Sequence, residues 1–108
     1  MKNLAIAVML VCSPALAGYA ADAKAVWTDQ CAKCHGAQGK GDTKMGKKLH
    51  IPDYTDAKVQ AGFTDEQAFK ALKEGIKDKS GNTRMKAVEG MSDEEINALV
   101  AYVRSLKP

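Results

Sequence analysis

The sequence predicts a small all-α domain, and three observations support this. Thr64 and Ser92 are each followed three positions later by Gln or Glu, which is the capping-box signature of a helix N-terminus. Apolar residues after each box recur at helical spacing, and no stretch keeps the apolar–polar alternation of a strand. The chain has 108 residues, which suits one domain with a modest hydrophobic core.

The first helix is predicted to begin at Asp22, as its N-cap, and to run towards Cys34. One face of this helix carries apolar or neutral residues at i, i+3, i+4 and i+7: Ala23, Val26, Trp27 and Gln30. The segment 36–53 contains four glycines, and Pro52-Asp53 marks its end. We therefore predict a flexible loop there.

Three more helices are predicted. Thr55–Gln60 is expected to form a short helix closed by Gly62, and the box Thr64/Gln67 opens a helix that Gly75 stops. The latter helix should bury Ala68, Phe69 and Leu72. Residues 76–91 are predicted as a second loop, and the box Ser92/Glu95 opens the last helix. That helix should present one apolar face, formed by Ile96, Leu99, Val100, Val103 and Leu106. Met91 and Ile96 are expected to form a hydrophobic staple at its start.

The N-terminus is typical of a secretory signal peptide. Lys2 is followed by the apolar run Leu4–Cys12, and Ala15-Leu16-Ala17 is a small-x-small cleavage signal. We interpret residues 1–17 as the signal peptide and residues 18–108 as the mature domain. An uncleaved membrane anchor is the alternative, but the apolar run is short and Pro14 breaks it. We therefore predict that the mature protein is exported to the periplasm. After cleavage it is expected to have no membrane-spanning segment.

Cleavage also changes the cysteine count and the charge. It removes Cys12, leaving Cys31 and Cys34, and it removes one lysine, which lowers the formal charge from +3 to +2. A weakly basic domain of this size does not have the clustered positive charge typical of nucleic-acid binding.

The run Cys31–His35 carries the chemistry. Two cysteines three positions apart, followed directly by a histidine, form the attachment pattern of c-type haem. Each thiol can form a thioether to one haem vinyl group, and His35 can reach the iron. A thioredoxin-like pair would need a βαβ context, a zinc site needs four ligands, and a bare disulfide needs no histidine. We therefore predict one covalent haem c, held by Cys31 and Cys34.

The iron then needs a second axial ligand or an open site. The mature chain offers three methionines. Met91 is expected to be a staple residue, and Met45 to pack or to be exposed in the loop near the motif. Met85 is an isolated apolar residue between Arg84 and Lys86, in a segment with no helical face to serve. We therefore predict His35 and Met85 as the axial ligands.

With these residues in view, the chain resembles class I c-type cytochromes, the soluble monohaem cytochromes of bacteria. Trp27 precedes Cys31 where that family has an aromatic residue, and Leu99 and Tyr102 match positions that pack against it. The resemblance implies a cytochrome c fold, with crossing N- and C-terminal helices around the haem.

The resemblance also bears on both axial ligands. The segment 51–55 is similar to the Pro-Asp segment whose proline carbonyl accepts a hydrogen bond from the axial histidine, here Pro52 and His35. Arg84-Met85 before Ser92 is similar to the axial-methionine loop. One departure is Lys86, which stands where related sequences usually have proline. A proline there would stiffen the loop through its fixed φ, so the change bears on the strength of the Met85–iron bond.

The predicted function is one-electron transfer in the periplasm by a six-coordinate haem, not catalysis. Two alternatives remain: an electron-transfer subunit of a larger dehydrogenase, and a haem peroxidase or gas-binding protein if Met85 is labile. The partners are expected to be redox proteins with an acidic docking surface. This protein is expected to be a monomer that binds them in transient complexes. The lysines that would face such partners lie in the two loops: Lys40, Lys44, Lys47, Lys48, Lys77, Lys79 and Lys86.

Overall fold

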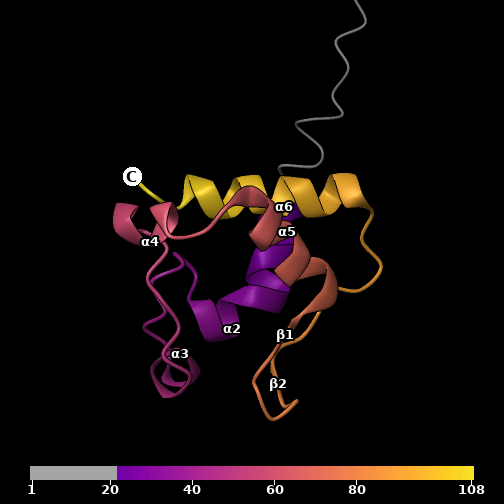
Figure 1. The fold of residues 1–108 in the computed structure, drawn as a ribbon. Helices are drawn as coiled ribbons and strands as arrows, with labels where there is room; N and C mark the ends of the chain where they lie inside the picture. The colour runs from indigo at the N-terminus through magenta and orange to yellow at the C-terminus, as the bar shows by residue number, and fades with distance from the viewer. Residues whose placement is uncertain (1–21) are drawn as a thin grey trace, which may run out of the picture.

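The structure is a computed structural model that describes residues 22–108, so the predicted signal peptide at 1–17 lies outside the described residues. Helices make up most of the described chain (Figure 1), which confirms the all-α prediction. Between residues 22 and 108, no helix is long and apolar enough to cross a membrane. After a helical segment at 22–26, the elements are η1 (Trp27–Cys31), α2 (Ala32–His35), α3 (Lys44–Lys48), α4 (Ala57–Ala61), α5 (Asp65–Glu74), β1 (Ile76–Lys77), β2 (Thr83–Met85) and α6 (Asp93–Ser105).

The N-terminal helical run contains a π-helical turn, η1, that the sequence pattern did not predict. Its backbone bond runs from the Ala32 amide to the Trp27 carbonyl, five residues back. A π turn holds more residues than an α turn, so the buried face moves on by about one position. Gln30, predicted on that face, is therefore exposed, and Cys31 packs against the core instead. Asp22 is already helical rather than the N-cap.

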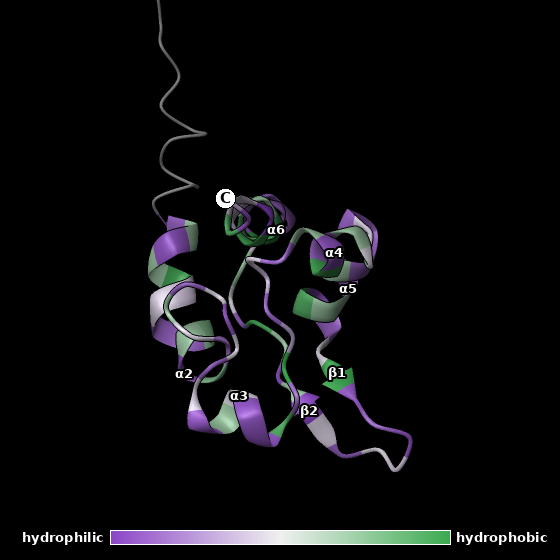
Figure 2. Ribbon diagram, turned by 90° about the vertical axis from the view of Figure 1, so that its left-hand side faces the viewer, coloured by the Kyte–Doolittle hydropathy of each residue, from purple (hydrophilic) through white to green (hydrophobic). Residues whose placement is uncertain are grey.

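The core lies where this run crosses α6. Ala23, Trp27, Leu99 and Val103 form one buried cluster, and the ring of Tyr102 lies 5.8 Å from that of Trp27. Figures 1 and 2 show α6 crossing the N-terminal run at a steep angle, and α6 is seen end-on in Figure 2. Four members of the predicted apolar face of the last helix are buried, namely Ile96, Leu99, Val100 and Val103, while Leu106 is the C-cap and is only half-buried against the core.

Both predicted capping boxes are present. The Thr64 hydroxyl accepts from the Gln67 amide, while the Gln67 side chain accepts from the Thr64 amide, and α5 ends at Gly75. Ser92 and Glu95 make the same reciprocal pair at the start of α6. The short helix α4 begins two residues later than Thr55, because the Asp56 carboxylate caps it by accepting from the Lys58 amide.

The two predicted loops contain regular structure. In the first, α3 begins because the Thr43 hydroxyl accepts from the Gly46 amide. In the second, β1 and β2 pair antiparallel, with Ile76 opposite Met85. The strands have only two and three residues, too few for a recognisable alternation. Met85, predicted in irregular structure, thus ends a strand.

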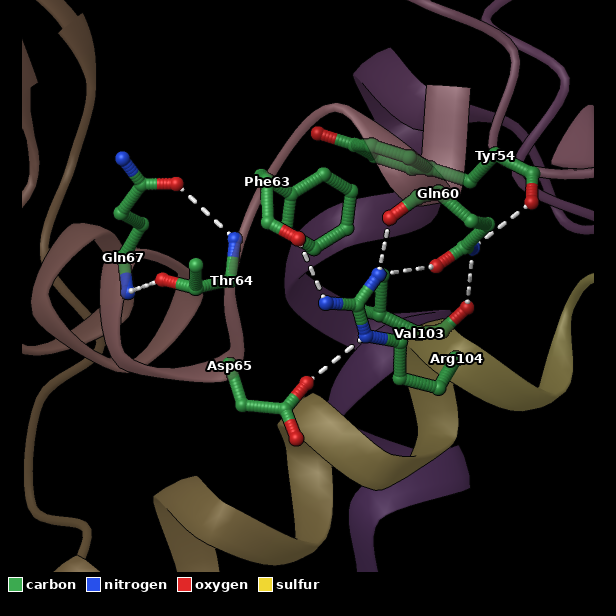
Figure 3. Close-up of polar contacts among 8 residues, drawn as sticks. All are labelled: Tyr54, Gln60, Phe63, Thr64, Asp65, Gln67, Val103 and Arg104. Carbon is green, nitrogen blue, oxygen red and sulfur yellow. Dashed lines mark hydrogen bonds and ion pairs between the residues drawn. The ribbon is translucent and has the colours of Figure 1, made fainter. Parts of the chain in front are cut away.

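Hydrogen bonds of the buried Gln60 and the partly exposed Arg104 fix α6 to the segment before α5 and to the first residue of α5 (Figure 3). Gln60 is only 5% exposed, and its amide nitrogen donates to the carbonyls of Tyr54 and Val103, both at 2.8 Å. Arg104 donates to the Asp65 carboxylate at 2.7 Å and to the Phe63 carbonyl at 2.7 Å, and it also bonds Gln60. Its guanidinium lies 4.1 Å from the centre of the Phe63 ring. The position of Tyr54 is therefore set by α6.

Truncation of Leu99 tests the importance of this crossing. Leu99 is 0% exposed and belongs to the cluster around Trp27, so Leu99→Ala leaves a cavity between the helices. We expect the holoprotein to lose about 2–5 kcal/mol of its free energy of unfolding, measured by urea denaturation. Asn97→Ala, at an exposed position of the same helix, should change it by less than about 0.5 kcal/mol. Equal losses in the two variants would contradict this account of the core.

Candidate functional site

The two cysteines lie on the continuous helical run that carries the core. Cys31 is the last residue of η1 and Cys34 lies in α2, so the run Cys31–His35 is helical throughout. Both are free thiols, and both are half-buried. Burial, with a smaller contribution from Cys34, raises the pKa of the Cys31 thiol to about 11. Before haem is attached, Cys31 is therefore a protonated, partly shielded thiol at neutral pH.

The ring of His35 lies beside two aromatic side chains. Its centroid is 5.4 Å from that of Trp27 and 5.5 Å from that of Tyr54, which stacks on it at an interplanar angle of 29°. Burial lowers the pKa of His35, which favours the neutral imidazole that binds metals. Nδ1 is buried and has no hydrogen-bond partner. A buried polar atom without a partner is costly, so Nδ1 has an unfilled position for a hydrogen bond or for a metal, the two uses that the ring nitrogens of a metal-binding histidine have.

The predicted hydrogen bond from His35 to the Pro52 carbonyl is not formed in this structure. The carbonyls of Ile51 and Pro52 instead pack against Gly41, where a Cβ atom would lie 2.6 Å from the former and 3.1 Å from the latter. Gly41 in turn donates its amide to the His35 carbonyl at 2.7 Å. The segment therefore approaches the backbone of His35 through Gly41, and it reaches the ring through Tyr54.

The glycine-rich loop folds back on the end of α2. The Thr43 hydroxyl donates to the Cys34 carbonyl at 2.5 Å, and the Tyr54 amide donates to the Gly39 carbonyl at 2.8 Å. A Cβ atom at Gly46 would lie 2.7 Å from the Cys34 carbonyl oxygen, so only glycine allows this approach. The Trp27 indole N–H, expected to need a partner, donates to the Gly36 carbonyl at 3.1 Å.

Met85 lies on a different part of the molecule from His35. Figure 2 shows α2 and β2 on opposite sides of the molecule, and Met85 is half-buried. Its backbone is closely packed against the end of α5, since a Cβ atom at Gly75 would lie 2.7 Å from the Met85 carbonyl oxygen and 2.9 Å from the Ala87 nitrogen. Three residues after Met85, the Val88 amide donates to the Leu72 carbonyl of α5 at 2.9 Å.

The other two methionines lie as predicted. Met91 is half-buried and packs against the core cluster, which suits a staple residue. Met45, on α3, is 39% exposed. No three His, Cys, Asp or Glu side chains gather as a metal site within residues 22–108.

Comparison with known proteins identifies the family to which this architecture belongs. The profile of the cytochrome c family matches residues 20–107. This chain belongs to the cytochrome c family. It is 26% identical to cytochrome c-554(547) of Halothiobacillus neapolitanus over 91 residues, 84% of this chain and all of that one. Among solved structures it is similar to the KustC0563 c-type cytochrome, with 30% identity and a TM-score of 0.66 over 80% of this chain and 98% of that one.

A point mutant of KustC0563 is also similar, with 31% identity and a TM-score of 0.64 over 80% of this chain and 99% of that one. The cytochrome c fold expected from the resemblance is thereby confirmed, and so is haem c as its covalent cofactor. The family's function is haem-based electron transfer, and its members are typically carriers.

The residues present fit a covalent haem. Two free thiols and a buried imidazole lie within five consecutive helical residues, and thiols with an adjacent histidine are the donor set that such a group requires. The thioether of Met85 lies on a separate element, β2. Sequence reasoning missed the supporting residues Gln60 and Arg104, because their partners lie up to 44 positions away.

The contact between Gly75 and Met85 can be tested with a matched pair of glycines. Gly75 and Gly81 both have positive φ, of 78° and 85°, so alanine is strained at either, and more so at Gly75, whose ψ of −178° puts it in a region that essentially only glycine adopts. Only at Gly75 does the new Cβ also clash with backbone; at Gly81 nothing lies within 4 Å. We expect Gly75→Ala to lower the free energy of unfolding more than Gly81→Ala, by at least about 1 kcal/mol, in denaturant titrations. Equal values would show that the approach is not needed.

Proposed function

We propose that this cytochrome is an exported, periplasmic one-electron carrier. In this proposal Cys31 and Cys34 form the thioether bonds to the haem, and His35 and Met85 are the axial ligands. The observation that carries the proposal is the arrangement at α2, where two free thiols adjoin a buried imidazole whose Nδ1 has no partner. A covalent haem with both axial positions filled supplies reversible one-electron chemistry at iron.

Each side chain has a separate task. The thiols fix the cofactor on one helical run, so that it cannot dissociate. Trp27 and Tyr54 restrict the His35 ring, which limits the rearrangement that a change of charge at the site would otherwise cause. The thioether of Met85 is a soft, neutral donor, and such a donor raises the reduction potential of the site. The packing of the Met85 backbone on Gly75 holds that donor in place without a following proline.

The two alternatives differ from this proposal in measurable ways. A peroxidase or gas-binding protein needs an open or labile position opposite His35, and distal acid–base groups. The second histidine of the described chain, His50, is exposed on the loop after α3. A subunit of a dehydrogenase would elute with its complex in size-exclusion chromatography of native extract, whereas a free carrier elutes alone.

The partner surface is proposed to be basic. Seven lysines lie in the segments 36–53 and 76–91. Three of them, Lys44, Lys47 and Lys48, belong to α3, which lies at the far end of the molecule from α6 (Figures 1 and 2). Positive charge there would attract a partner with an acidic docking surface and mainly raise the encounter rate.

Replacement of the predicted axial methionine tests the ligand set. Met85→Ala should abolish the methionine–iron charge-transfer band at the red end of the ferric spectrum. It should also lower the midpoint potential, within the roughly 0.8 V range that axial ligands cover. Met45→Ala is the matched control, because Met45 is exposed, and it should keep both properties. A band that survives in Met85→Ala, or that is lost in Met45→Ala, would assign the ligand elsewhere.

Ionic strength tests the docking surface. The bimolecular rate of electron transfer with an acidic redox partner should fall by about tenfold or more from low salt to roughly 0.5 M salt, because salt screens exposed charges. The double variant Lys47→Gln/Lys48→Gln should reduce the low-salt rate. The control Lys24→Gln/Lys107→Gln removes the same charge from exposed sites in the segment 22–26 and at the C-terminus, and it should change the rate less. A rate independent of salt in stopped-flow measurements would count against a basic docking surface.

A further inference from the structure

We infer that Arg84 is a positioning residue that ties the Met85 side of the site to the segment beside His35, by a hydrogen bond to the Leu49 carbonyl. The inference rests on the proposed function, in which Met85 ligates the iron. It assigns to a charged surface side chain the task of holding the two sides of the site at a fixed spacing.

The bond itself joins elements that are distant in sequence. Nη2 of Arg84 donates to the Leu49 carbonyl at 2.8 Å, across 35 positions. Leu49 is the C-cap of α3, and Figure 2 shows α3 and β2 at the same end of the molecule, away from α6. The last carbonyls of a helix have no partner within it, and the negative end of the helix dipole favours a cation there. Arg84 meets both needs.

This bond has no substitute in the described part of the chain. Within residues 22–108, it is the only hydrogen bond or ion pair between residues 27–56 and residues 75–91. The first range contains both cysteines and His35, and the second contains Met85. All other polar connections between these two parts run through α5 or α6.

Each end of the bond is attached to a ligand-bearing element. The Leu49 amide donates to the Met45 carbonyl within α3, and α3 is held on α2 because Thr43 bonds both the Gly46 amide and the Cys34 carbonyl. At the other end, Arg84 directly precedes Met85 on β2. A shift of β2 away from α3 therefore has to break the bond.

The bond also explains how the Met85 loop tolerates Lys86. Proline after the axial methionine would restrict φ and so stiffen the loop. Here the packing of Gly75 restrains the loop from α5, and Arg84 restrains it from α3. Arginine suits this task because its planar guanidinium stays charged and carries several donors, whereas glutamine is neutral and shorter.

Competition by imidazole measures the restraint. Free imidazole binds ferric haem only after the protein's own sixth ligand has left, so a weaker Met85–iron bond makes the apparent dissociation constant smaller by the same factor. Loss of one exposed hydrogen bond predicts about three- to tenfold tighter imidazole binding in Arg84→Gln holoprotein. Arg84→Lys, which keeps the charge and one donor group, should lie between Arg84→Gln and the wild type.

The matched control is Lys77→Gln. Lys77 is an exposed cation on the paired strand β1, so its removal changes the charge of the hairpin by the same amount without touching Leu49. We expect its imidazole affinity to stay within about twofold of wild type. Arg84→Gln with wild-type affinity, or Lys77→Gln with the same tightening as Arg84→Gln, would overturn the inference.

The failure of the proposed function would give a different result. If the wild-type ferric protein lacks the methionine–iron band and Met85→Ala binds imidazole no more tightly than wild type, then Met85 is not a ligand, and both proposals fall. If the band is present and Met85→Ala shows the tightening while Arg84→Gln does not, only the role of Arg84 is wrong. Arg84→Gln should unfold at nearly the wild-type denaturant concentration, since Arg84 is exposed.

Discussion

The packing of the N-terminal helical run against α6 is the constraint on which the rest of the structure depends, and it places the His35 ring beside Trp27 and Tyr54. Neither aromatic ring is held by its neighbours in sequence alone. Trp27 packs against Leu99 and Tyr102 of α6. The Tyr54 carbonyl is bonded by Gln60, which also bonds the Val103 carbonyl of α6. The orientation of the imidazole therefore follows from the crossing of the terminal helices.

The two sides of the site are built by different means. The side of His35 uses buried aromatic rings and close glycine approaches to the end of α2, and such packing tolerates little displacement. The side of Met85 is a small hairpin that rests on α5 through Gly75 and through the bond from Val88 to Leu72. One side thus belongs to the hydrophobic core, whereas the other is an appendage of it.

Local sequence determined what could be predicted. The boxes Thr64/Gln67 and Ser92/Glu95 act within four residues, so α5 and α6 were predicted with their correct starts. The apolar face of α6 was predicted because it is long and regular. The motif Cys31–His35 led to the cofactor for the same reason, since its meaning lies in its own spacing.

Features that leave no local signal in the sequence were not predictable. The π turn at Trp27–Cys31 leaves no mark in the apolar spacing, and it moved the buried face from Gln30 to Cys31. The strands around Met85 are too short to show a period. The bonds of Arg104 and Gln60 join segments about 40 positions apart, and many arginines and glutamines would look the same in the sequence.

The hairpin that ends at Met85 has a consequence for how the molecule opens. Its backbone bonds are few and its residues are mostly exposed, whereas α6 lies against the core with four buried side chains. Segments with few buried contacts detach at a lower free energy than the whole fold. Amide hydrogens of the hairpin should therefore exchange with solvent through a local opening, long before those of α6. With the proposed ligand set, Met85 could then leave the iron while the helices that hold His35 remain folded.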